Sequence, residues 1–225
     1  MGKKTYYQTI TAPSEGVYKE KGSKFIAYAF PIHSREEAME RLQEVKKWHI
    51  KARHHCFAWR LGYTGDLFRA ADDGEPSGTA GKPILGQIDK FNLTNVMVVV
   101  VRYFGGTLLG TSGLIRSYRE ATADAFAKAE IKKYPILDVY RISFGYDLMS
   151  QTMSAVKKSG LKIIKQEFTD NGKVELGIPF QEVDEALLKL KAGISQVSTN
   201  QASMEDWPEG VKVELVRKGL DYLGD

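Results

Sequence analysis

The sequence predicts an α+β protein of two domains. Its 225 residues are enough for two modest hydrophobic cores, and a hydrophobic content of 43% beside 27% charged residues is ordinary for a globular protein. The pattern of elements changes after "KKYP", which places one domain at residues 1–134 and the other at 135–225. The halves also differ in charge: the first carries 21 Lys and Arg against 14 Asp and Glu, and the second 11 against 14.

The first domain is predicted to alternate strands and helices. An apolar and aromatic run predicts a strand at residues 24–32, and Ser34 with Glu37 has the spacing of a capping box that opens a helix ending near Trp48. Apolar alternation predicts a further strand at residues 54–62. The remaining elements are a short helix from Thr79 or Pro83 to Asp89, a buried valine strand ending at Val101, and a helix that begins near Thr111 or Ser112, either of which could be its N-cap.

The second domain is predicted to follow a strand-helix-strand-strand-helix-strand order. The expected strands cover residues 137–144, 161–168, 173–178 and 195–203, and the expected helices cover 148–159 and 182–191. Asn171-Gly172 predicts a two-residue hairpin turn, and "WPEGVKVELVR" would add an edge strand. This order is the split βαβ arrangement of ferredoxin-like domains.

A glycine-rich loop separates the valine strand from the helix that follows it. Its glycine spacing resembles that of a Walker A loop, but Thr111 stands where the phosphate-binding lysine would be. This substitution excludes a P-loop NTPase. The free N–H groups of a helix N-terminus, backed by arginines, predict an anion site instead. The alternative is that the glycines only permit a tight turn and close packing. The residues predicted to bind phosphate or nucleic acid are Arg102, Gly105, Gly106, Gly110, Ser112 and Arg116.

A second loop, "AADDGEPSGTAGKPIL", is rich in glycine and acidic residues and is predicted to face the first across a cleft. Its carboxylates would order the loop or, alternatively, hold Mg²⁺ through water molecules. No metal ligand set and no cofactor is assigned. The residues of this facing loop are Asp72, Asp73, Glu75, Ser77, Gly78 and Thr79.

The spacing of the histidines and the cysteine argues against a zinc site. His54, His55 and Cys56 lack a second Cys/His pair for zinc, and alternation along a strand would put His55 on the opposite face from the other two. Cys56 is therefore expected to behave as a small buried hydrophobic residue. A single cysteine, no signal-like N-terminus and a longest apolar run of only six residues, 96–101, predict a cytoplasmic protein without a membrane partner.

Four ordered blocks of the first domain together resemble the YigZ/IMPACT family. They are "KGSKFIAYAFP", "HHCFAWRLG", "DDGEPSGTAGKPIL" and "VVVVRYFGGTLLGTSGLIRSY", spread over residues 18–126. The resemblance implies that the first domain is similar in fold to the second domain of a small-subunit ribosomal protein. It also implies that the ferredoxin-like second domain is similar to the last domain of elongation factor G. Eukaryotic relatives act as translational regulators.

The expected function is that of a phosphate- or nucleic-acid-binding protein that acts in translation regulation through RNA or ribosome contact. The acidic second domain would contact a protein partner. Two alternatives stay open. One is an enzyme that acts on a small phosphorylated or peptide-like substrate, with Asp73 or Glu75 as general base. The other is a protein-binding adaptor without an anion site. The sequence favours a binding role over an enzymatic one.

Overall fold

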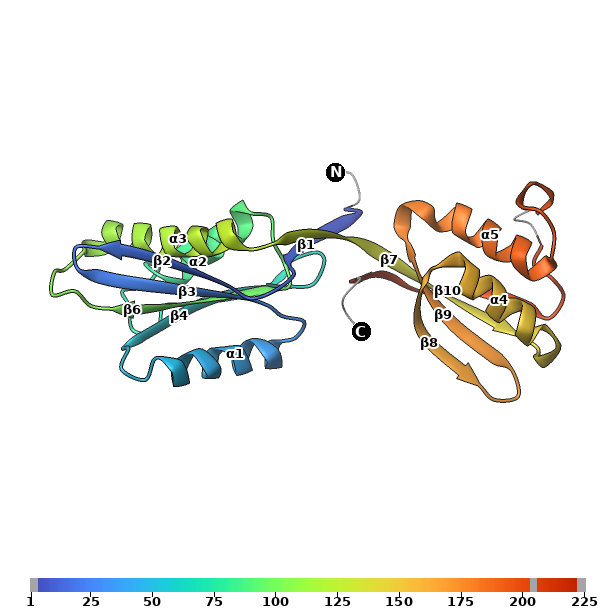
Figure 1. The fold of residues 1–225 in the computed structure, drawn as a ribbon, viewed down its shortest axis with the longest axis horizontal. Coiled ribbons are helices and arrows are strands. Elements are labelled where there is room, and N and C mark those ends of the chain that lie inside the picture. Colours follow the sequence, from blue (N-terminus) through green and yellow to red (C-terminus); the bar gives the residue numbers. More distant parts are fainter. Residues whose placement is uncertain (1–3, 203–205, 222–225) are drawn as a thin grey trace. The chain divides into compact units, whose positions relative to one another are not determined.

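The computed structural model of the chain describes residues 4–202 and 206–221 (Figure 1). The chain divides into two compact units, one of residues 6–134 and one of residues 135–221 together with residues 4 and 5. Each unit is an antiparallel sheet with helices packed on it. The predicted α+β class is therefore confirmed.

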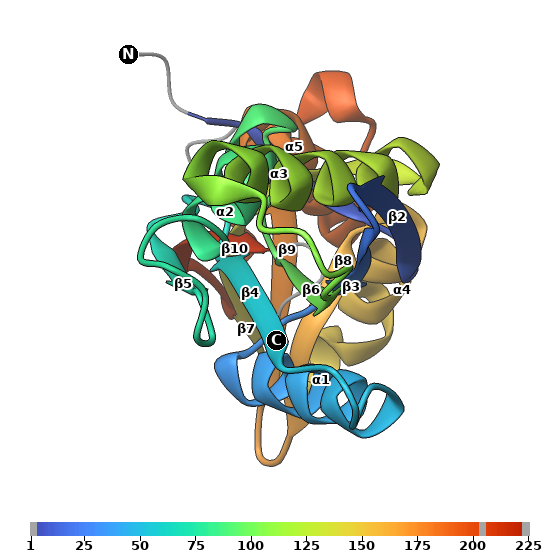
Figure 2. The same cartoon turned by 90° about the vertical axis from the view of Figure 1, so that its left-hand side faces the viewer.

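The first unit is built on a five-stranded antiparallel sheet. Its order is β2 (Ser14–Glu20), β3 (Ser23–Pro31), β6 (Val96–Tyr103), β4 (His54–Leu61) and β5 (Leu67–Ala71). Helices α2 (Gly81–Lys90) and α3 (Gly110–Lys128) cover one face, and α1 (Arg35–Trp48) covers the other (Figures 1 and 2). Strand β1 (Tyr6–Ile10) pairs with β7 (Ile131–Phe144), which begins in this unit and continues into the second.

Two hydrophobic cores, one on each face of this sheet, explain the run of valines in β6. Val98 and Val100 belong to the core under α2 and α3, whereas Val99 and Val101 belong to the core under α1. Because successive side chains of a strand point to opposite faces, a strand covered on both sides is apolar throughout. Strand β4 divides its side chains in the same way, and Cys56 lies in the core under α2 and α3.

Helix α1 begins as its capping residues predict. The Ser34 hydroxyl accepts the Glu37 N–H at 3.0 Å, and the Glu37 carboxylate accepts the His33 N–H at 2.8 Å. These bonds satisfy N–H groups that have no partner inside the helix. Leu42 and Val45 then bury the inner face. The predicted start at Ser34 and end at Trp48 are confirmed.

The second unit has the strand order β8-β9-β7-β10. After β7 come α4 (Met149–Ser159), β8 (Lys162–Phe168), β9 (Gly172–Pro179), α5 (Val183–Ser195) and β10 (Val211–Asp221), with short 3₁₀ turns at Tyr146–Leu148, Phe180–Glu182 and Thr199–Gln201. Helices α4 and α5 lie on one face of the sheet (Figure 1). Val156, Leu187 and Leu190 pack there against β7 and β9.

The predicted last strand at residues 195–203 is wrong over residues 195–202, and residue 203 lies outside the described residues. Helix α5 continues to Ser195, and a 3₁₀ turn follows at Thr199–Gln201. The helix extends because Leu187, Leu190 and Ile194 keep a helical spacing on its buried side. The sheet is completed instead by β10, the segment that the sequence offered only as an additional edge strand.

The hairpin between β8 and β9 is present, but its turn differs from the prediction. Gly172 is already paired with Phe168, so three residues, 169–171, make the connection instead of Asn171-Gly172. A Cβ at Gly172 would lie 2.2 Å from Cε2 of Phe144. This glycine is therefore required by packing against an aromatic ring rather than by the turn.

No helix within residues 4–202 or 206–221 combines the length and the apolar character needed to cross a membrane.

Candidate functional site

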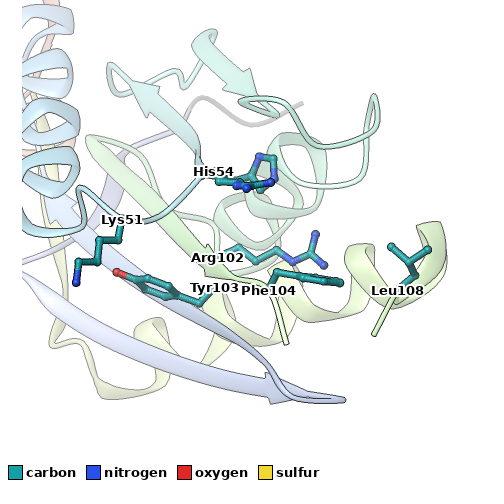
Figure 3. Close-up of a pocket in the computed structure, with 7 residues that line it drawn as sticks. Lys51, His54, Arg102, Tyr103, Phe104 and Leu108 are labelled. Carbon is teal, nitrogen blue, oxygen red and sulfur yellow. The ribbon is translucent and has the colours of Figure 1, made fainter. Parts of the chain in front are cut away.

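A pocket of about 460 Å³ lies where β4 begins and β6 ends. Strands β4 and β6 are paired with His54 opposite Arg102, which joins the segment after α1 to the start of the glycine loop. None of the lining residues is a carboxylate, so we call this site the basic pocket (Figure 3). The basic pocket is lined by Lys51, Arg53, His54, Arg102, Tyr103, Phe104 and Leu108.

Arg102 forms a buried ion pair with Glu75. Its side chain is only 8% exposed, and its Nη1 donates to both carboxylate oxygens of Glu75, at 2.7 and 2.9 Å. The guanidinium carbon lies 5.6 Å from the ring centroids of both Phe25 and Phe104. Its Nε is buried and has no hydrogen-bond partner. The charge of Arg102 is thus balanced from within the protein.

Glu75 also joins Arg102 to a buried chain of polar groups. Tyr118 donates its hydroxyl hydrogen to Glu75 Oε1 at 2.8 Å, and Sγ of Cys56 lies 3.2 Å from the Tyr118 hydroxyl oxygen. Burial raises the pKa of both the Cys56 thiol and the Tyr118 phenol well above their ordinary values. Both groups therefore stay protonated at neutral pH, which leaves no thiolate for nucleophilic chemistry.

Asp72 and Asp73 bind the backbone around them. Asp72 Oδ1 accepts the N–H groups of Ala80 at 3.0 Å and Gly81 at 2.8 Å, and its Oδ2 accepts that of Gly78 at 2.8 Å. Asp73 Oδ2 accepts the His55 N–H at 2.7 Å. The three carboxylates of the facing loop thus all accept hydrogen bonds from the protein itself.

The other predicted residues of the facing loop include two that stabilise the conformation of the loop itself. The Thr79 hydroxyl is buried and donates to the Pro76 carbonyl at 2.6 Å, Gly78 has a positive φ of 76°, and Ser77 is exposed. The loop leads into α2, which begins at Gly81, between the two predicted starting residues. The described part of the chain has no group of three or more His, Cys, Asp or Glu side chains placed to hold a metal ion.

Replacing Asp72 with asparagine is expected to lower the free energy of unfolding at pH 7 by about 1–2 kcal/mol, the usual effect of weakening a helix cap. Burial alone would raise the pKa of Asp72, but the three N–H bonds outweigh it and hold the pKa below its ordinary value of 3.8. A lowered pKa in the folded state gives stability that is complete above the unfolded value and is lost as the pH falls through the folded one.

The difference between Asp72→Asn and the wild type should therefore shrink below about pH 3.8. Urea denaturation at pH 7 and pH 3 measures it. Asp66→Asn, a change at an exposed carboxylate of the same unit, is the control and should leave both values unchanged. A difference that is the same at both pH values would contradict the assigned role.

The glycines of the loop before α3 differ in their structural roles. A Cβ at Gly105 would lie 1.9 Å from the carbonyl carbon of Gly22, and the Gly105 N–H already donates to the Ser23 hydroxyl at 3.1 Å. Gly106 and Gly110 have positive φ values of 86° and 68° and no neighbouring heavy atom within 4 Å of an added Cβ. Close packing therefore accounts for Gly105, whereas the backbone at Gly106 and Gly110 is open to an approaching group.

Helix α3 begins earlier than predicted. Its first residue is Gly110 with Leu109 at the N-cap, so neither Thr111 nor Ser112 is the cap, and no side chain of the described chain caps it. The helix thus starts two or three residues before the predicted position, and its first residue, Gly110, has a positive φ of 68° that glycine adopts without strain.

The structure does not bring Arg102 and Arg116 into one site. Arg116 lines a separate hollow with Ser112 and Lys21 at the first turn of α3, and its Nη2 donates to Glu20 at 2.7 Å. Arg102 lines the basic pocket. Both arginines named by the sequence analysis are thus paired with a glutamate.

The unpaired cations of the basic pocket are two that the sequence analysis did not name. Lys51 and Arg53 are exposed, and neither forms an ion pair with any residue that the structure describes. The run "KARHH" was the available signal, but its position beside Arg102 follows only from the pairing of β4 with β6.

His54 presents a defined face to the basic pocket. Its Nδ1 lies 2.9 Å from the Asp73 carbonyl oxygen, which can only accept a hydrogen bond. Nδ1 therefore carries a hydrogen, and in the neutral ring Nε2 is an acceptor. His54 and Gly74 are also in close contact, since a Cβ on Gly74 would lie 3.3 Å from Nδ1. The facing loop thus fixes one wall of the pocket.

Comparison with known proteins places the chain among relatives of similar length. Residues 21–126 match the family model described as the Impact N-terminal domain. The IMPACT family member YigZ of Escherichia coli K12 is 32% identical over 197 residues, which cover 87% of this chain and 96% of YigZ. The protein IMPACT homolog of Saccharomyces cerevisiae is 36% identical over 96 residues, which cover 40% of this chain and 36% of that protein.

A crystal structure described as that of a hypothetical protein shares the fold of this chain. It is 28% identical, has a TM-score of 0.74, and the match covers 95% of this chain and 98% of the other. The matched family segment contains the whole basic pocket, from Lys51 to Leu108. On the strength of these matches, and of the motifs that form the pocket, the chain belongs to the IMPACT family.

Proposed function

We propose that the basic pocket binds the sugar-phosphate backbone of RNA and that the chain regulates translation through this contact. The observation that carries the proposal is the pair of exposed, unpaired cations, Lys51 and Arg53, in a pocket lined by no carboxylate. Such cations neutralise phosphates and release their counterions. The first unit, which holds the pocket, carries the excess of basic residues.

The proposed RNA path continues from the basic pocket over the glycine loop to the start of α3. The backbone at Gly106 and Gly110 is open there, and the first N–H groups of α3 have no side-chain cap. Ser112, Arg116 and Lys21 line the hollow at this point together with Glu20, which is paired with Arg116. A helix N-terminus favours negative charge, so a second phosphate fits this end of the path. Arg102 contributes by shaping the pocket floor through its pair with Glu75.

The arrangement supports binding rather than acid-base catalysis. Both oxygens of Glu75 accept hydrogen bonds from Arg102, and one also accepts from Tyr118. Asp73 is engaged by the His55 N–H. A general base must reach a substrate proton with a free lone pair, and Glu75, one of the two carboxylates considered for this role, uses both of its oxygens within the protein.

Translation is the process that the family resemblance indicates, since the eukaryotic relatives that it implies act as translational regulators and the yeast IMPACT homolog matches 40% of this chain. The strand order β8-β9-β7-β10 supports a ferredoxin-like second unit. We propose that residues 135–225, which carry 11 Lys and Arg against 14 Asp and Glu, contact a protein partner, because acidic surfaces are repelled by nucleic acid and attract basic protein surfaces.

The test replaces Lys51 and Arg53 together with glutamine and measures binding of a fluorescent single-stranded 12-mer RNA by anisotropy at several salt concentrations. Loss of two phosphate contacts is expected to weaken binding at low salt and to reduce the slope of log affinity against log salt by about 1.4. The stability should be unchanged, because both side chains are exposed.

The matched control is Lys157→Gln with Lys158→Gln, which removes the same charge from exposed positions on α4 of the second unit. It should leave both affinity and salt slope near the wild-type values. Equal losses in the two double variants would mean that only net charge matters, and the basic pocket would then have no special role.

A further inference from the structure

We infer that the basic pocket takes an unpaired RNA base on the ring of Phe104 and thereby selects single strands over duplexes. The inference rests on the proposed function, since it names the part of RNA that the pocket recognises. Phe104 directly follows β6 and is 59% exposed, an unusual setting for a large aromatic side chain. Its ring lies along the basic pocket beside the Arg102 guanidinium (Figure 3).

The Phe104 ring lies against the guanidinium of a buried ion pair. The Arg102 guanidinium is 5.6 Å from the Phe104 centroid and is itself clamped by Glu75 and by the ring of Phe25. In Figure 3 the guanidinium lies between His54 and Phe104, and Leu108 lies at the opposite end of the pocket from Lys51. A rigid aromatic surface loses little conformational entropy when a planar group stacks on it.

The basic pocket combines an aromatic surface on which a base can stack with cations that can bind the adjoining phosphates. Every base has a flat π-face that stacks on an aromatic side chain without regard to sequence, and a phenylalanine ring adds no hydrogen-bond readout. Lys51 and Arg53 line the same pocket and can bind phosphates of the strand that carries that base. The volume of about 460 Å³ is typical of pockets that enclose a small planar ligand.

A duplex cannot use this ring. In A-form RNA the base faces are stacked on one another, and only base edges are accessible in the wide, shallow minor groove. Binding a base on Phe104 would require the duplex to unpair and unstack at that step. Duplex RNA would therefore contact only the cations of the pocket.

The experiment compares wild type, Phe104→Leu and Phe104→Trp for binding to three labelled ligands of equal length: single-stranded RNA, an abasic ribose-phosphate strand, and duplex RNA. Phe104→Leu is expected to weaken single-stranded RNA binding about tenfold or more, the loss of one base-aromatic stack. Binding of the abasic strand and of the duplex should not change. Phe104→Trp should bind single strands at least as well as wild type, with its added fluorescence quenched.

Phe68→Leu is the matched control. Phe68 is similarly exposed, at 54%, and carries the Arg60 guanidinium 5.0 Å from its centroid, but it lies on β5 outside the basic pocket. This variant should bind all three ligands like the wild type.

The outcomes separate the inference from the proposed function. If Phe104→Leu binds single strands as well as wild type, or loses affinity for the abasic strand equally, the stacking role is overturned even though Lys51 and Arg53 still bind phosphate. If the Lys51→Gln, Arg53→Gln variant binds all three ligands like wild type, or if the wild type binds none of them, the proposed function fails and the inference fails with it.

Discussion

Replacing Arg102 with methionine is expected to lower the free energy of unfolding by about 3–5 kcal/mol, the usual effect of removing one partner of a buried ion pair. The Glu75 side chain is 3% exposed, and without Arg102 its carboxylate keeps only the Tyr118 hydroxyl as a side-chain donor. Methionine keeps an unbranched apolar side chain at this position but removes the guanidinium, which lies 5.6 Å from the ring centroids of Phe25 and Phe104. Urea denaturation followed by tryptophan fluorescence measures the loss, because Trp59 is buried in the same unit.

The double variant Arg102→Met, Glu75→Gln separates the charge from the packing. Glutamine still accepts the Tyr118 hydrogen bond but leaves no charge to be desolvated, so the double variant should recover about 2 kcal/mol relative to Arg102→Met alone. Simple additivity of the two single changes would show that the pair is not coupled. A loss of RNA binding in Arg102→Met therefore cannot by itself identify a phosphate contact, since the same change weakens the pocket wall.

Changing Gly105 to alanine is expected to destabilise the protein by about 3 kcal/mol, at the upper end of what overpacking costs. The added Cβ would meet the backbone of Gly22 and Ser23 at 1.9 and 2.1 Å, and a backbone cannot move aside as a flexible side chain can. The Gly105 N–H bond to Ser23 would also be disturbed.

Gly106→Ala is the adjacent control. Its Cβ would point into open space, so only the positive φ of 86° is penalised, at about 1 kcal/mol. Thermal denaturation of the two variants gives the comparison. Gly105 does not have a positive φ, so similar losses at both positions would contradict the close contact with Gly22 and Ser23 as the reason for this glycine.

Much of the fold follows from patterns within single elements. Ser34 with Glu37 locates α1, and the alternation through Cys56 and Phe57 locates β4. Strand β5 escaped prediction because four of its five residues are exposed and leave no apolar alternation. Strand β10 is expected only as an additional edge strand because the segment 195–203 is predicted as the last strand, whereas that segment begins with the end of α5 and contains a 3₁₀ turn. Which of two candidate segments joins a sheet is decided by tertiary pairing, which local sequence does not contain.

The sequence predicts the two loops that border the basic pocket, but it does not predict which cations of the pocket are unpaired. Four glycines pointed to the loop before α3, but residue type alone could not tell the packed Gly105 from the open Gly106. Arg102 was selected for its charge, and its burial against Glu75 depends on a loop 27 residues earlier in the chain. Lys51 and Arg53 were overlooked because only the antiparallel register sets them beside Arg102.

The buried thiol gives the protein a built-in reporter of its own opening. Cys56 is the single cysteine of the chain, is fully enclosed, and has a raised pKa because of its burial. A thiol-specific reagent can label it only in molecules whose first unit has transiently opened, and labelling cannot be confused with reaction at another cysteine. Alkylation rates under native conditions would thus report the local stability around the Glu75 network without denaturant.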